Sequence, residues 1–166
     1  MYAELFLQIL HNTFKAGIGC EGKRQHDLHL KGAIDMLFTF ELDTPKQGLV
    51  DITKEVEAAV RESGVYEGIC VIFCPHTTAS ITITENVDPE LKADFIMGMD
   101  STFPGLKNYR HTGGNADAHI KSSISGTGET LIVTKGKPLL GQWQGIYFCE
   151  FDGKRKRQFF VKVLGE

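Results

Sequence analysis

Alternation of apolar and polar residues predicts a series of β-strands from Met36 onward. Every second residue from Met36 to Leu42 is apolar, which predicts a strand with one buried face. Further apolar or alternating runs predict strands over the segments ICVIFC, SITIT, LIVT, LLGQWQGIYFCEF and QFFVKVL. Asp152-Gly153 separates the last two segments, and this dipeptide between two alternating runs predicts a hairpin turn.

Segments between these strands carry helix signals instead. Asp51 is a suitable N-cap for a helix that Ser63-Gly64 ends, and Asp88-Pro89 opens a second helix. Asn115 caps a third, shorter helix that ends at Gly126. The predicted order is β-α-β-β-α-α-β-β-β, which indicates an α+β fold built on mainly antiparallel sheets.

Composition and charge narrow the class of protein. With 166 residues, of which 42% are hydrophobic and 23% charged, the chain is expected to form one globular domain. The net charge of -3 leaves no strongly basic field, so nucleic acid is not an expected partner, and the basic run Lys154–Arg157 is interpreted as a solvated turn. No apolar run reaches the roughly 18 residues of a membrane span, so no membrane contact is expected.

The cysteines bear on the cellular compartment. Cys20, Cys70, Cys74 and Cys149 match neither a disulfide framework nor a zinc ribbon. Cys70 and Cys74 lie in one predicted strand and are too far apart along it to form a disulfide with each other. Free buried thiols are typical of a reducing compartment, so a cytoplasmic location is predicted.

The densest polar segment, YRHTGGNADAH, places two histidines around the start of the third helix. His111 precedes the N-cap and His119 lies one turn inside the helix, so both imidazoles can converge on a divalent metal. His76, at a strand end, is the best third ligand, with Glu85 and Asp88 as rivals or as groups that orient an imidazole. The metal's identity is left open, with zinc and magnesium as candidates, and the alternative is that these histidines only form hydrogen bonds between loops.

The same segment also has features of a phosphate site. Gly113 and Gly114 permit a tight turn, the following helix presents free N–H groups, and Arg110 adds a fork-shaped positive charge. The alternative interpretation is an ordinary loop that leads into a capped helix.

Two positions in the predicted strand over residues 139–151 are also candidates. Trp143 faces the side opposite Gln142 and Gln144, which either line a polar pocket or face water. Glu150 lies in the apolar run FCEF, where a carboxylate is costly unless it is paired. It is therefore a candidate partner for a metal or another cation, or a charge that protects an edge strand.

Five runs closely resemble the YjbQ family, also named secondary thiamine-phosphate synthase. They are DITKEV, CPHTTASITITENVDPELKADF, YRHTGGNADAHIKSS, LLGQWQGIYFCEFDG and VKVLGE. The resemblance covers residues 36–166, which are expected to form a single domain. Residues 1–35 precede the usual start of the family and are interpreted as an N-terminal extension or, preferably, as the result of a misassigned start.

The resemblance implies a β-sandwich core of two mostly antiparallel sheets with about three helices, assembled as a homotrimer in the cytoplasm. It also implies a weak thiamine-phosphate synthase activity, which couples hydroxymethylpyrimidine diphosphate to thiazole phosphate and releases diphosphate. On the family's motif positions the candidate catalytic residues are Glu85, Asp88, Asn115 and Asp117. The candidates for binding a phosphorylated small molecule are Thr77, Arg110, Gly113, Gly114, Gln142 and Trp143, and the candidate metal ligands are His76, His111 and His119.

Two other functions stay open at this point. One is a homotrimer that binds a metal or a small ligand and whose synthase activity is incidental. The other is a metal-dependent phosphoester hydrolase in which Glu85 or Asp88 acts as general base toward a metal-bound water.

Overall fold

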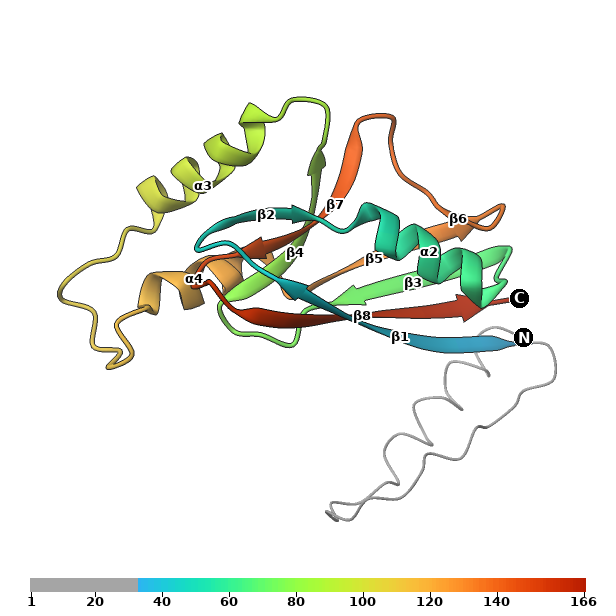
Figure 1. The fold of residues 1–166 in the computed structure, drawn as a ribbon, viewed down its shortest axis with the longest axis horizontal. Helices are drawn as coiled ribbons and strands as arrows, with labels where there is room; N and C mark the ends of the chain where they lie inside the picture. Colours follow the sequence, from blue (N-terminus) through green and yellow to red (C-terminus); the bar gives the residue numbers. More distant parts are fainter. Residues whose placement is uncertain (1–32) are drawn as a thin grey trace, which may run out of the picture.

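The computed structural model describes residues 33–166, which form two antiparallel sheets packed face to face together with three helices (Figure 1). The predicted α+β class with a β-sandwich core is confirmed. Of the segment 1–35, which was predicted to be an extension or a misassigned start, residues 1–32 lie outside the described part. The first strand begins at Ile34, two residues before the predicted start.

Every strand pair in the two sheets is antiparallel. The larger sheet has the order β1 (Ile34–Asp43), β8 (Lys156–Gly165), β3 (Glu67–Phe73), β5 (Gly128–Thr134) and β6 (Lys137–Pro138). The smaller sheet has the order β2 (Gly48–Asp51), β7 (Gln144–Glu150) and β4 (Ala79–Glu85). The helices are α2 (Thr53–Ser63), α3 (Glu90–Thr102) and α4 (Ala116–Ser125).

The main core lies between the inner faces of the two sheets. Phe148 on β7 and Phe159 on β8 are both buried, and their ring centroids lie 6.4 Å apart. The buried face of α2 adds Val56, Ala59 and Val60 to the same core. Burial of these side chains by both sheets and α2 provides the main driving force for folding.

The outer face of the smaller sheet is covered by α3 and α4. Cys149 on β7 packs with Ala118 of α4 and with Phe95 and Ile96 of α3 in a second apolar cluster. Each helix begins close to its predicted N-terminus. Asp88, for example, accepts a hydrogen bond on Oδ1 from the backbone N–H of Glu90 at 2.9 Å. This second cluster fixes both helices, and with them the loop between them, to the sheet.

The outer face of the larger sheet has no element of residues 33–166 packed over its apolar side chains. Leu37, Ile69, Phe73 and Ile132 point to this face and are 40–60% exposed. Such a contiguous apolar surface is typical of a contact with another molecule.

The hairpin predicted at Asp152-Gly153 is wrong. β7 pairs with β2 and β4, whereas β8 pairs with β1 and β3, so the chain crosses here from one sheet to the other. Gly153 permits a close approach between loops, because a Cβ at this position would collide with the carbonyl oxygen of Pro45. The alternating pattern could not distinguish a hairpin from a crossover, since both strands have one buried face in either case.

The strand predictions also differ from the structure in number and length. β2 and β6 were not predicted, because four and two residues are too few to show an alternating pattern. β7 begins at Gln144, and residues 139–143 form a loop instead of the predicted strand. None of the helices within residues 33–166 is long and apolar enough to cross a lipid bilayer.

Candidate functional site

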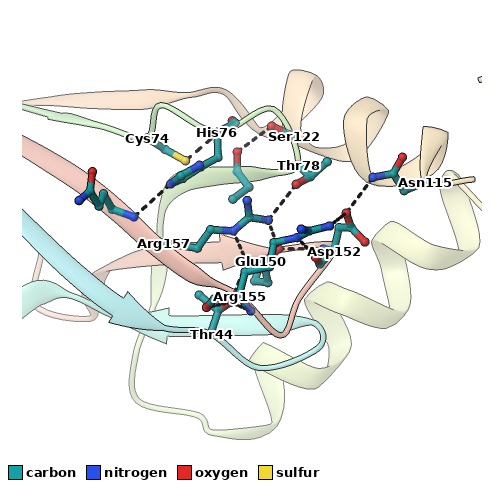
Figure 2. Close-up of polar contacts among 12 residues, drawn as sticks. Thr44, Cys74, His76, Thr78, Asn115, Ser122, Glu150, Asp152, Arg155 and Arg157 are labelled. Atoms are coloured by element: carbon teal, nitrogen blue, oxygen red, sulfur yellow. Dashed lines mark hydrogen bonds and ion pairs between the residues drawn. The ribbon is translucent and has the colours of Figure 1, made fainter. Parts of the chain in front are cut away.

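A buried ion pair between Glu150 and Arg157 lies at the centre of the polar contacts (Figure 2). Arg157 donates from Nε to Glu150 Oε2 and from Nη2 to Glu150 Oε1, both at 2.7 Å. Its Nη2 also donates to Thr78 Oγ1 at 2.8 Å. The carboxylate accepts two more bonds at 2.8 Å, from Thr44 Oγ1 and from the backbone N–H of Asp152. Glu150 is therefore the partner of a cation, as predicted, but it lies on the central strand of its sheet and protects no edge.

The pair is charged in spite of its burial. Burial alone raises the pKa of Glu150, but the hydrogen bonds from Arg157, Asp152 and Thr44 outweigh it and hold that pKa below the usual value. The interpretation of Lys154–Arg157 as a solvated turn is wrong for Arg157, which is 7% exposed. Arg157 shares the inner face of β8 with Phe159, and extending the alternation of this strand backward by one step would have predicted its burial.

His76 lies beside this pair, and its imidazole already has a partner. The backbone N–H of Gln158 donates to His76 Nε2 at 3.0 Å, so this nitrogen is unprotonated. Burial and the positive charge of Arg157 lower the pKa of His76. His76 is thus a neutral residue that connects the loop before β4 to β8, and its Nε2 is not available to a metal.

A second chain of contacts links the ion pair to the loop between α3 and α4. Asn115 donates from Nδ2 to Asp152 Oδ2 at 2.7 Å, and Arg155 donates to the same oxygen at 2.7 Å. Burial raises the pKa of Asp152, but these two hydrogen bonds outweigh it and lower the pKa overall. Because the amide nitrogen of Asn115 is used, its Oδ1 faces His111 Nε2 at 3.1 Å. His111 Nε2 is therefore the donor in this bond.

His111 and His119 lie together, as predicted. Their ring centroids are 4.9 Å apart in an edge-to-face arrangement. The turn between them is tight, because Gly114 has a φ of 74° and a Cβ on Gly113 would lie 2.7 Å from His111 Nε2. Arg110 is exposed in the same loop, next to His111. The loop and the start of α4 therefore carry two neighbouring imidazoles, an exposed guanidinium and a helix N-terminus, which suits an anionic ligand.

The predicted three-histidine metal site is not assembled within one chain. Among residues 33–166, no three His, Cys, Asp or Glu side chains are grouped so that they could hold a metal ion. The pair His111 and His119 offers two imidazoles, which suit zinc better than magnesium, because magnesium prefers oxygen ligands. A metal held here needs a further ligand from outside this pair.

Asp117 takes part in a different cluster. Lys121 is 1% exposed and donates from Nζ to Asp100 Oδ1 at 2.5 Å and to Asp117 Oδ2 at 2.8 Å. Burial alone lowers the pKa of Lys121, but the bonds to both carboxylates outweigh it and raise the pKa. This lysine was not predicted, although its i,i+4 spacing from Asp117 is typical of a helical ion pair.

A cavity of about 370 Å³ adjoins both clusters. Three carboxylates from three different segments line it, those of Asp100, Asp117 and Asp152. All three carboxylates contact a cation, either Lys121 or Arg155. The cavity has the size of a small-molecule pocket, and Lys46 lines it beside the three carboxylates, so its walls carry both signs of charge.

The other candidate residues lie at the opposite end of the smaller sheet. Glu85 pairs with Gln144 at this end, and the backbone N–H of Asn86 donates to the carbonyl of Trp143 at 2.8 Å. Trp143 is 61% exposed, and Gln142 and Asp88 are also exposed. Figure 1 shows this end where β4 leads into α3, away from α4. Within one chain the predicted residues therefore form two groups.

We name the two groups by their position. The histidine end consists of His76, Thr77, Arg110, His111, Gly113, Gly114, Asn115, Asp117 and His119. The tryptophan end consists of Glu85, Asn86, Asp88, Gln142 and Trp143. Thr77 is exposed in the loop before β4.

Comparison with known proteins shows the family of this chain. The family model described as UPF0047 protein YjbQ-like matches residues 38–166. The chain belongs to this family. The UPF0047 protein MJ1081 of Methanocaldococcus jannaschii is 52% identical over 134 residues, which cover 80% of this chain and 97% of that protein. The UPF0047 protein YugU of Bacillus subtilis is 48% identical over 132 residues, which cover 78% of this chain and all of that protein.

Solved UPF0047 structures have the same fold. An uncharacterised family member from Clostridium acetobutylicum is 49% identical to this chain, and its structure matches with a TM-score of 0.74. The match covers 76% of this chain and 98% of that chain. A YbjQ-like protein of unknown function from Sulfolobus solfataricus is 31% identical to this chain, and its structure matches with a TM-score of 0.77. The match covers 81% of this chain and 99% of that chain. The resemblance of residues 36–166 to the YjbQ family is thus confirmed.

Proposed function

We propose that this UPF0047 protein is an enzyme that couples hydroxymethylpyrimidine diphosphate to thiazole phosphate at its histidine end. One observation supports this most directly. His111 and His119 pack together at the start of α4, and hydrogen bonds through Asn115 connect His111 to Asp152 on the crossover between the two sheets. A ligand bound there would meet a fixed surface, which lowers the cost of ordering the site when the ligand binds.

The reaction requires stabilisation of charge more than a nucleophilic side chain. The C–O bond to diphosphate breaks, diphosphate leaves with the electron pair, and the thiazole nitrogen then forms a C–N bond with the pyrimidine cation. Arg110, the N–H groups of the His111 and His119 imidazoles and the N–H groups at the start of α4 would stabilise the departing diphosphate. The carboxylates of Asp117 and Asp152 in the adjoining cavity suit the amino group and the positive charge of the pyrimidine.

Other candidate residues take different roles in this proposal. Asn115 positions His111, because its side chain bonds both to that imidazole and to Asp152. Glu85 and Asp88 lie at the tryptophan end, so neither is placed to act as general base for a ligand at the histidine end of the same chain. This placement argues against the hydrolase in a single chain.

The test is formation of thiamine phosphate by the purified full-length protein from the two substrates. We expect a kcat/KM that approaches about 10⁴ M⁻¹s⁻¹, the lower range of evolved enzymes. The double variant His111→Ala, His119→Ala should lose at least about 100-fold. Lys54→Ala on α2 is the control, because Lys54 is exposed and belongs to neither end. Equal rates in the double variant and the wild type would overturn the proposal.

A second candidate function is a homotrimer that binds a metal or a small ligand and whose synthase activity is incidental. Two observations favour it: the apolar outer face of the larger sheet, which a neighbouring subunit would cover, and the imidazole pair, which lacks a third ligand within residues 33–166. Two results together would favour this candidate over the first: a kcat/KM far below about 10⁴ M⁻¹s⁻¹, and zinc binding that is lost when His119 is replaced.

A cytoplasmic location also belongs to the proposal. Cys70, Cys74 and Cys149 are free and buried, which suits a compartment that keeps thiols reduced. Cys20 lies outside the described residues.

A further inference from the structure

The residues that can bind or transform a ligand are divided between two ends of the smaller sheet. β4 and β7 pair over their whole length, with Glu85 opposite Gln144 at one end and Ala79 opposite Glu150 at the other. Six steps of about 3.3 Å separate these ends, which amounts to about 20 Å. A small phosphorylated ligand is much shorter than this distance, so one chain alone cannot bring both groups to it.

The tryptophan end has the properties of a docking surface. Trp143 and Val87 are each 61% exposed, and the two loops that carry them are held together by the backbone bond between Asn86 and Trp143. Exposed aromatic side chains of this kind are typical centres of protein interfaces. Glu85, Asp88 and Glu90 surround them in the sequence and give this end a negative charge.

The histidine end has the opposite charge. Lys107 and Arg110 are exposed in the loop between α3 and α4, and Lys154 is exposed on the crossover that follows Asp152. Arg155 and Lys156 on the same crossover are paired with Asp152 and Asp43. Arg155 bonds to Asp152, which Asn115 also contacts, so the crossover and the loop adjoin one another (Figure 2). The exposed side chains at this end are complementary to those at the tryptophan end.

We propose that the tryptophan end of one copy of this chain docks on the histidine end of a second copy, and that each complete site is shared between two subunits. Trp143 and Glu85 of one subunit would then lie at the site formed by His111, His119 and Arg110 of the next. The two surfaces differ, so the contact is head-to-tail, and such a contact forms a closed ring when the rotation between neighbouring subunits closes. The chemistry at the shared site rests on the proposed function, but the contact itself does not.

The first experiment follows Trp143 directly, because it is the only tryptophan in the chain. In the assembled full-length protein we expect a blue-shifted emission and acrylamide quenching several-fold weaker than that of free N-acetyl-tryptophanamide. Arg110→Glu should shift the emission to the red and restore quenching, whereas Lys54→Glu, which reverses an exposed charge on α2, should not. Trp143 that is quenched as readily as the free compound at every protein concentration would overturn the inference.

The second experiment mixes two defective variants. His119→Ala alters only the histidine end, and Trp143→Ala alters only the tryptophan end. Each variant alone is expected to lose coupling activity. In a random mixture each contact pairs two intact halves with a probability of one half times one half, so about a quarter of the activity should return.

The control is a mixture of His111→Ala with His119→Ala, in which every histidine end is defective and no activity should return. Failure of the first mixture to recover activity, while fluorescence shows Trp143 to be covered, would overturn the shared site. If the wild type does not form thiamine phosphate, the proposed function fails, and the fluorescence experiment still decides whether the two ends dock.

Discussion

Glu150 and Arg157 belong to different sheets, yet their side chains form a two-pronged ion pair in which both N–H···O distances are 2.7 Å. The two side chains are 0% and 8% exposed. The pair thus fixes the crossover between β7 and β8, and Asn115 attaches to this crossover through Asp152. The same contacts that hold the sheets together therefore set the position of the histidine end.

Removal of one partner from this pair should be strongly destabilising. Arg157→Met leaves the carboxylate of Glu150 buried without its counter-charge, and we expect the free energy of unfolding to fall by about 3–5 kcal/mol. The measurement is urea unfolding at neutral pH. Lys156→Met is the matched control, because Lys156 is 89% exposed and 3.4 Å from Asp43, and its loss should cost less than about 1 kcal/mol. Similar losses in both variants would contradict the structure.

The same carboxylate predicts a sensitivity to acid. The pKa of Glu150 is lower in the folded protein than in the unfolded chain, so its contribution to stability is complete above the unfolded value of about 4.3. That contribution is lost as the pH falls through the folded value. The urea midpoint of the wild type should fall more steeply below about pH 4.5 than that of Glu150→Gln. Parallel curves for the two proteins would show that Glu150 does not titrate as described.

The buried thiols should be unreactive in the native protein. Burial raises the pKa of Cys70 and Cys74 to about 11 and that of Cys149 to about 12. In a Cys20→Ser variant, an aromatic disulfide reagent at pH 8 should label almost no thiol before unfolding and three afterward. Fast labelling without denaturant would mean that the core between the sheets opens readily.

Gly113→Ala should disturb the histidine end without unfolding the protein. The new Cβ would lie 2.7 Å from His111 Nε2 and 2.9 Å from Asn115 Oδ1, so it would force their hydrogen bond apart. We expect zinc or diphosphate binding to weaken about 10-fold, the usual effect of losing a group that orients an imidazole. Gly98→Ala is the control, because nothing lies within 4 Å of a Cβ there. If calorimetry gave equal affinities for both variants, the position of His111 would not affect ligand binding.

The sequence predicted where the helices and strands lie better than it predicted which strands pair. Alternation over residues 36–42 and helical spacing after Asp51, Asp88 and Asn115 were sufficient, because each depends on neighbours within a few turns. The hairpin at Asp152-Gly153 was wrong, because a strand keeps the same pattern in either sheet.

The candidate site was predicted in its parts but not in its geometry. The sequence by itself determined that His111 and His119 converge, since one loop and one helical turn bring them together. Only the tertiary structure decided that His76 bonds to Gln158, that Arg157 is buried against Glu150, and that Trp143 lies at the far end of the sheet. These facts depend on how two sheets pair and pack over long sequence separations, and local patterns of polarity do not encode that choice.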